Sequence, residues 1–86
     1  MTTKIYVASI NHKYGMNFYA SLTNEGLLKQ VASFCKEYWS DNTKYGLETL
    51  SDDASDEEII DTYFNFQAEH GGEELWDSCN DVALEP

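Results

Sequence analysis

Apolar side chains form two dense runs near the start of the chain, residues 4–10 and 16–22, with a polar stretch between them. Both runs are rich in β-branched and aromatic residues, which is typical of strands. The polar stretch ends in Gly15, which can adopt the positive φ that closes a hairpin loop. The pattern therefore predicts a β-hairpin. Both runs carry apolar side chains on each face, so the pattern does not identify the face that covers the core.

After residue 22 the apolar side chains recur at three- and four-residue steps, which is the spacing of one helix face. This stripe comprises Leu27, Val31, Phe34, Cys35 and Tyr38, and it is widened by Leu28, Ala32 and Trp39. Thr23 or Asn24 is suited to cap the first turn, where Glu25 favours the helix dipole. We expect a helix that runs to about Trp39 and lies across the hairpin. Residues 40–46 have the composition of a loop.

A second helical pattern begins at Ser55, which forms a capping box with Glu58. The predicted inward face comprises Ile59, Ile60, Tyr63, Phe64, Phe66 and Gln67, and the outward face comprises Glu57, Asp61, Asn65 and Glu69. The acids of the first turn lie against the positive end of the helix, which stabilises it. The run His70-Gly71-Gly72 is expected to end the helix.

The last segment, residues 73–84, fits neither the helical nor the strand period cleanly. A two-stranded hairpin is marginal alone, which favours a third antiparallel strand over residues 75–79. A short helix over residues 73–79 is the alternative. The predicted fold class is α+β, with a small antiparallel sheet in the order β-β-α-α-β along the chain and two helices packed on one face. The length of 86 residues indicates a single domain, 1–86.

The charge of the chain is divided sharply at residue 51. Residues 1–50 hold all five lysines and a net charge of +1, whereas residues 51–86 hold twelve acids, no Lys or Arg and a net charge of −12. Many of these carboxylates lie within the screening length of about 8 Å of one another, so they repel in the folded state. A chain that retains such repulsion is expected to use the field, although a solvated face that serves solubility remains the alternative.

A field of this sign attracts a basic partner. We expect a nucleic-acid-binding protein or complex whose Lys and Arg side chains bind carboxylates in place of phosphates. The central patch is predicted to comprise Asp52, Asp53, Asp56, Glu57 and Asp61, extended by Glu69, Glu73, Glu74, Asp77 and Asp81 if the last segment packs alongside. A net charge of −11 argues against direct binding of nucleic acid or of an anionic membrane, since both are polyanions.

Aromatic side chains are the second candidate surface. Those considered are Tyr6, Tyr14, Phe18, Tyr19, Tyr38, Trp39, Tyr45 and Trp76. They exceed what a small core needs, so some are candidates for a homodimer face or for apolar contact with a partner. A rival interpretation is therefore an inhibitor or adaptor that uses the aromatic hairpin face. Another is a soluble domain without a basic partner.

Metal binding and catalysis find little support in the sequence. Residues 41–52 have the length of an EF-hand loop, but Tyr45 stands at the fifth position and Asp52 replaces the bidentate Glu at the twelfth. His12 and His70 lie near predicted turns, outside any recognisable nucleophile motif. No phosphate-binding Gly-rich loop or zinc spacing occurs. We expect a protein that is not an enzyme, with no cofactor and no metal.

The two cysteines, Cys35 and Cys79, are too few for a secreted disulfide scaffold. Cys35 falls on the apolar face of the first helix and is interpreted as a small core residue. No apolar run approaches the roughly 20 residues that span a bilayer, and the N-terminal sequence lacks a signal-peptide pattern. Reduced thiols in a cytosol are the expected state.

The short chain, its hairpin-then-helix opening over residues 4–39 and the acidic run from Asp52 to Asp61 resemble a known type of protein. These are the small acidic proteins of bacteriophages and other mobile elements, which include anti-CRISPR and anti-restriction proteins that imitate DNA. The resemblance implies an inhibitor that binds its target directly, without a cofactor, in the cytoplasm of a bacterial host. The near-neutral first half departs from the most acidic mimics and implies one active face.

Overall fold

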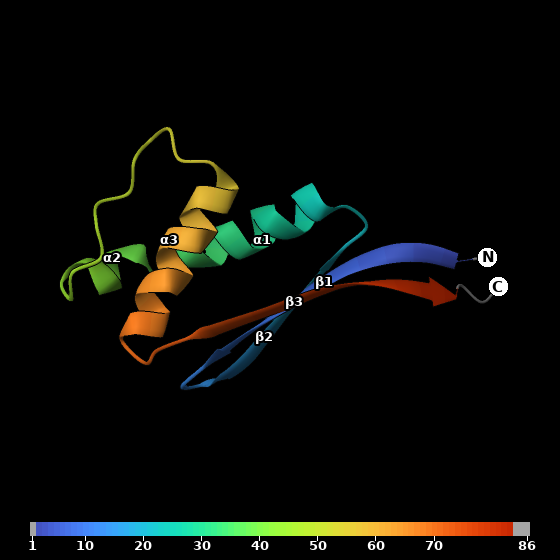
Figure 1. Ribbon diagram of the computed structural model, residues 1–86, viewed down its shortest axis with the longest axis horizontal. Helices are drawn as coiled ribbons and strands as arrows, with labels where there is room; N and C mark the ends of the chain where they lie inside the picture. The colour runs from blue at the N-terminus through green and yellow to red at the C-terminus, as the bar shows by residue number, and fades with distance from the viewer. Residues whose placement is uncertain (1, 84–86) are drawn as a thin grey trace.

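The computed structural model describes the backbone of residues 2–83 and the surroundings of the side chains of residues 3–80. Its elements are β1 (Thr2–His12), β2 (Gly15–Ser21), α1 (Asn24–Glu37), α2 (Trp39–Thr43), α3 (Asp56–Glu69) and β3 (Glu74–Ala83). The sheet is antiparallel with the strand order β2-β1-β3, and the two long helices lie on one side of it (Figure 1). The predicted α+β fold is confirmed.

The hairpin is longer and its turn is shorter than the sequence pattern predicts. β1 and β2 pair from Tyr6 opposite Ser21 to His12 opposite Gly15, which leaves two residues in the turn. Gly15 has a φ of +133°, a backbone conformation that other residues rarely adopt. β1 begins four residues before its pairing with β2, so its first part pairs with β3 alone and extends beyond the helices (Figure 1).

The uncertain last segment is a strand. β3 pairs with β1 along ten positions, from Thr2 opposite Ala83 to Asn11 opposite Glu74. The predicted third antiparallel strand is confirmed, and the alternative of a short helix over residues 73–79 is wrong. The reason is tertiary: the hairpin leaves one edge of β1 unpaired, and β3 satisfies its backbone groups.

Both long helices begin at the residues that the capping rules favour. The side chain of Thr23 accepts a hydrogen bond from the amide of Gly26 at 3.0 Å, so Thr23 rather than Asn24 caps α1. The side chain of Ser55 accepts one from the amide of Glu58 at 3.2 Å, as the capping box predicts. α3 ends at Glu69, and Gly71 adopts the left-handed conformation with a φ of +65°.

The predicted loop over residues 40–46 is wrong in its first part, where the chain forms the short helix α2. α1 ends at Glu37 rather than Trp39, because Tyr38 leaves the helical conformation. Asn42 then donates a side-chain hydrogen bond to the carbonyl of Tyr38 at 2.9 Å, and Thr43 donates one to Ser40 at 2.8 Å. These local bonds stabilise a single turn that apolar spacing does not predict.

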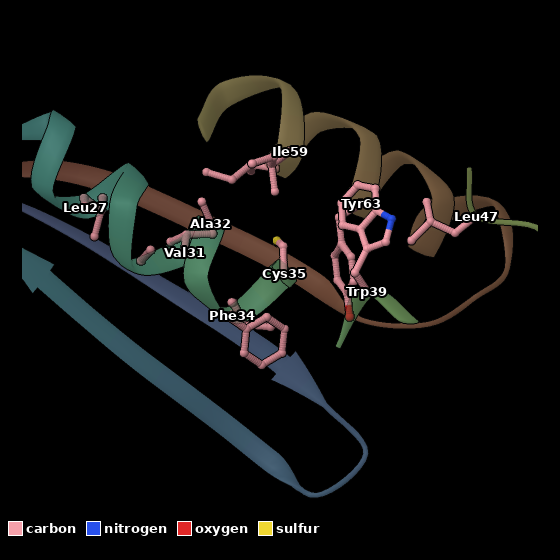
Figure 2. Close-up of a cluster of buried hydrophobic side chains, with 12 residues drawn as sticks. Leu27, Val31, Ala32, Phe34, Cys35, Trp39, Leu47, Ile59 and Tyr63 are labelled. Atoms are coloured by element: carbon pink, nitrogen blue, oxygen red, sulfur yellow. The ribbon is translucent and has the colours of Figure 1, made fainter. Parts of the chain in front are cut away.

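The core lies between the sheet and the two long helices. Ile10, Cys35 and Tyr63 are its largest fully buried side chains, one each from β1, α1 and α3. Ile59 and Tyr63 point from α3 toward α1, and Tyr63 lies beside Trp39 with ring centroids 6.0 Å apart (Figure 2). The predicted stripe of α1 is confirmed, except that Leu28 is half-buried and Tyr38 is exposed.

Candidate partner-binding groove

Two adjoining hollows lie between α3 and β3. One, of about 560 Å³, reaches the α3–β3 turn, and the other, of about 480 Å³, reaches the start of α1. Ile60, Asp61 and Leu75 line both, so the hollows form one continuous groove. We call it the acidic groove, because its lining includes five acidic residues: Glu57, Asp61, Glu73, Glu74 and Asp77.

The spacing of the residues explains why these carboxylates meet. Glu57 and Asp61 are four residues apart on α3, which places them on one helix face. Asp77 pairs with Ala8 in the middle of the sheet, and Ala8 is a core residue beneath the helices. Directly paired residues point to the same side of a sheet, so Asp77 faces the helix layer and reaches the groove.

The half of the groove near α1 combines charge with an apolar floor. Leu27, Val31 and Ile60 are buried there, with Leu28 and Leu75 half-buried beside them. Glu57, Asp61 and Asp77 are exposed at the same hollow. Neither α3 nor β3 contains a Lys or Arg residue that could neutralise these acids. The hollow therefore offers apolar contact at its buried floor and negative charge at its solvent-exposed side.

Four residues of the predicted patch do not line the groove. Asp52 and Asp53 are exposed in the segment that precedes α3, Asp56 is half-buried at its first turn, and Glu69 is exposed in its last turn. Asp81, which the sequence analysis added to the patch, has its side chain outside the described residues. The structure thus brings Glu57, Asp61, Glu73, Glu74 and Asp77 together from the predicted set and leaves the others apart.

Glu73 has a structural role that its sequence context does not reveal. It is half-buried, and its carboxylate accepts a hydrogen bond from the Tyr63 hydroxyl. Its backbone amide donates to the Gln67 side-chain oxygen at 3.1 Å, while the Gln67 amide nitrogen donates to Asn42 at 2.9 Å. This network joins α2, α3 and the start of β3, so it fixes the end of the groove.

The same buried region raises the pKa of two side chains, Cys35 and Tyr63. Burial, and secondarily the charge of Glu73, raises the pKa of the Cys35 thiol from 9.0 to about 12. Burial also raises the pKa of the Tyr63 hydroxyl, and the hydrogen bond to Glu73 adds to this increase. Both groups are therefore neutral at physiological pH. Cys35 has the environment of a core residue, as predicted, rather than that of a reactive thiolate.

The turn between α3 and β3 depends on its two glycines. Gly71 supplies the positive φ, and a Cβ built on Gly72 would overlap the side-chain oxygen of Gln67. That oxygen accepts the amide of Glu73, so a side chain at Gly72 would disturb the network described above. The glycine pair therefore sets the position at which β3 begins beside α3.

The rejected metal and catalytic candidates lie in ordinary structural settings. Asp41, the first residue of the EF-hand-like segment, is part of α2, so residues 41–52 do not form a calcium loop. Within the described part of the chain, no group of three or more His, Cys, Asp or Glu side chains could hold a metal ion. The His70 ring stacks on Phe66 with centroids 4.0 Å apart, and His12 lies 3.2 Å from the Asn17 side-chain oxygen.

A third hollow, of about 1040 Å³, lies at the end of the molecule where the hairpin turn approaches α2, and no sequence pattern predicts it. Three of the predicted surface aromatics line it: Tyr14, Tyr38 and Tyr45. The Lys13 ammonium lies 5.1 Å from the Tyr14 ring centroid, and the Lys44 ammonium lies 5.4 Å from that of Tyr45. Lys13 and Lys44 are 31 residues apart in the sequence, so only the fold reveals their proximity to one hollow.

No protein-family model matches the chain, and neither the curated proteins nor the solved structures provide a match. The described helices include none that is both long enough and apolar enough to cross a membrane.

Proposed function

We propose that the protein is a non-enzymatic inhibitor whose acidic groove occupies the nucleic-acid-binding site of a bacterial defence complex. The observation that carries the proposal is the convergence of five acidic residues from α3, β3 and the turn between them, a segment that contains no Lys or Arg. Carboxylates held on a helix and a strand can replace phosphates as partners of Lys and Arg. The protein would act in the cytoplasm of a bacterial host, as an anti-CRISPR-like or anti-restriction DNA mimic.

The composition of the groove suits the two parts of a basic side chain. Lys and Arg have apolar stems and charged ends, and they gain most when both parts are satisfied. The floor formed by Leu27, Val31 and Ile60 can cover a stem, while Asp61 and Asp77 accept hydrogen bonds from its charged end. Protein surfaces that bind nucleic acid expose many such side chains. Bare nucleic acid and anionic membranes would instead be repelled.

The test is a pull-down from bacterial lysate with the wild-type protein as bait, repeated at low and high salt. We expect retention of a nucleic-acid-binding complex, its loss at high salt and its release by added double-stranded DNA. Glu57→Gln, Asp61→Asn and Asp77→Asn together should weaken binding by at least tenfold. Asp56 is left unchanged because it contributes to the start of α3 rather than to the groove.

The matched control replaces Glu25, Glu37 and Glu48 with Gln. These acids are exposed and lie outside the groove, and the control changes the net charge by the same amount. Circular dichroism establishes that both triple variants remain folded. Equal loss of binding in the two variants would show that the net charge of the chain, and not the position of the acids in the groove, determines affinity. The proposal would be contradicted if the wild-type bait retained no complex that added DNA displaces. That result would favour a soluble phage or plasmid domain without a basic partner.

A second candidate function is an inhibitor or adaptor that binds by apolar contact. It is favoured by the exposure of Phe18 and Trp76, whose side chains are 74% and 61% accessible. Both lie on the side of the sheet away from the helices, so they are separate from the groove. A partner bound there would show little change in affinity between low and high salt, whereas a partner of the acidic groove would be released.

A further inference from the structure

The side of the sheet that the helices leave uncovered has an unusual composition. The register places Phe18, Ser9 and Trp76 in one row across the three strands, opposite to the side that carries Ala8 and Ile10. Met16, half accessible at 50%, lies further along the same face. An uncovered face of an antiparallel sheet is normally polar. We call this surface the open sheet face.

Ser9 shows how closely the aromatic side chains cover this face. It is only 7% accessible although no helix lies over it. Phe18 pairs with Ser9 on one side and Trp76 pairs with it on the other, so their rings must exclude water from the small residue between them. The row therefore presents two large aromatic side chains with a covered small residue between them, which makes the surface over the three strands apolar.

Charge separates this face from the rest of the molecule. Among its described residues, Glu74 is the one charged side chain, and it lies at the end of the face, where β3 begins. The whole chain carries a net charge of −11. Two copies that approach through the groove or the outer side of α3 would bring carboxylates together. Approach through the open sheet face keeps the groups that repel on the outside.

We propose that the open sheet face binds a second copy of this chain. In a two-fold arrangement, Trp76 of each copy would pack against Phe18 of the other, so the same surface supplies both sides of the contact. Two sheets packed in this way lie about 10 Å apart. Both acidic grooves remain on the outside. A basic partner gains little here because Glu74, at the end of the face, is the one carboxylate among its described residues. This inference goes beyond the proposed function and does not depend on it.

The test measures molar mass by light scattering over a range from low micromolar to near-millimolar protein. We expect the mass of the wild-type chain to rise from 9.8 kDa toward twice that value. Added salt should strengthen association, because it screens the repulsion between copies. This is the opposite of the salt effect expected at the acidic groove, so the two proposals can fail separately.

The informative variant is Phe18→Thr with Trp76→Thr, which keeps strand-forming residues at two exposed positions. It should remain at 9.8 kDa throughout the range. Tyr45→Thr is the control, since Tyr45 is an exposed aromatic residue outside the sheet. This variant should dimerise as the wild type does. Urea unfolding establishes that all three proteins are folded.

A second readout is the fluorescence of Trp76. The chain has two tryptophans, and Trp39 is already buried, so a concentration-dependent blue shift reports burial of Trp76. Wild-type protein should show the shift and Phe18→Thr should show less of it. A wild-type mass that stays at 9.8 kDa at every concentration and salt would overturn the inference. Dimerisation of the double variant with unchanged affinity would also overturn it, because another surface would then be responsible.

Discussion

The acidic groove and the open sheet face share one strand, β3, and differ in almost every other respect. Leu75 and Asp77 point from this strand toward the helices, whereas Trp76 points the other way. One side is therefore negative around an apolar floor, and the other is nearly uncharged and aromatic. Because side chains alternate along a strand, a single segment can supply two surfaces that attract different partners. Salt should weaken binding at one and strengthen it at the other.

Reversing charge in the groove should produce the largest effect. Asp61→Lys with Asp77→Lys places two cations where basic side chains are expected to bind, so affinity for a captured complex should fall by at least about a hundredfold. Glu37→Lys with Glu48→Lys is the control with the same change in net charge. Binding of the two variants is compared by titration at fixed salt. Similar losses would show that the position of the charges is unimportant.

The next effect concerns the network that holds β3 beside α3. Tyr63→Phe removes the hydroxyl that donates to Glu73 and leaves a half-buried carboxylate without that donor. The free energy of unfolding should fall by about 1–3 kcal/mol. Urea unfolding measures the loss, and Tyr45→Phe, which alters an exposed ring, should change stability little. An unchanged stability of Tyr63→Phe would mean that the network does not fix the strand shared by both surfaces.

Alkaline pH should destabilise the core beneath the two surfaces. The pKa of the Cys35 thiol is raised to about 12, so the folded state holds this proton where the unfolded chain releases it. Stability is then unaffected well below pH 9.0 and declines as the pH rises from 9.0 toward about 12. The slope should reach about 1.4 kcal/mol per pH unit for this group. The raised pKa of Tyr63 acts in the same direction from its ordinary value of 10.0 upward, so the two contributions overlap.

Cys35→Ala separates the contribution of the thiol from that of Tyr63. The variant loses some packing at every pH, so the informative quantity is the slope of stability against pH rather than its absolute value. Urea unfolding at a series of alkaline pH values should give a shallower decline for the variant. Identical slopes for the two proteins would show that Cys35 does not titrate with a raised pKa.

The smallest expected effect is on the affinity of the acidic groove when the open sheet face is altered. Phe18→Thr with Trp76→Thr alters the open sheet face and leaves every carboxylate of the groove in place. Affinity of one groove for a basic partner should therefore stay within about twofold, or roughly 0.4 kcal/mol. The same titration is used as for the charge-reversal variants. A loss as large as theirs would favour apolar contact through the aromatic hairpin face.

The sequence predicts the elements of this fold better than the site that they build. Helix spacing and capping residues determine α1 and α3, and the four-residue separation of Glu57 and Asp61 predicts their common face. The place of Asp77 depends on its register with Ala8, which no local pattern contains. β3 is ambiguous in sequence because both of its sides carry large apolar residues, so it lacks the alternation of a half-exposed strand.

The acidic groove contains only part of the predicted acidic patch, for a related reason. Composition indicates how many acids a segment holds but not the direction in which each points. Asp52 and Asp53 precede the helix, and Glu69 lies outside the groove lining although it is on the same helix. Glu73 lies in the groove but is bound to Tyr63, a contact that requires the α3–β3 turn. Charge alone therefore cannot distinguish a partner-binding acid from a structural one.

The most direct test of the account is the salt dependence of binding to a captured nucleic-acid-binding complex. Affinity is measured at several ionic strengths for the wild type, for the groove variant Glu57→Gln, Asp61→Asn, Asp77→Asn and for the control Glu25→Gln, Glu37→Gln, Glu48→Gln. The account predicts a steep decline with salt for the wild type and the control, and a shallower one for the groove variant. Equal slopes for all three proteins would contradict it.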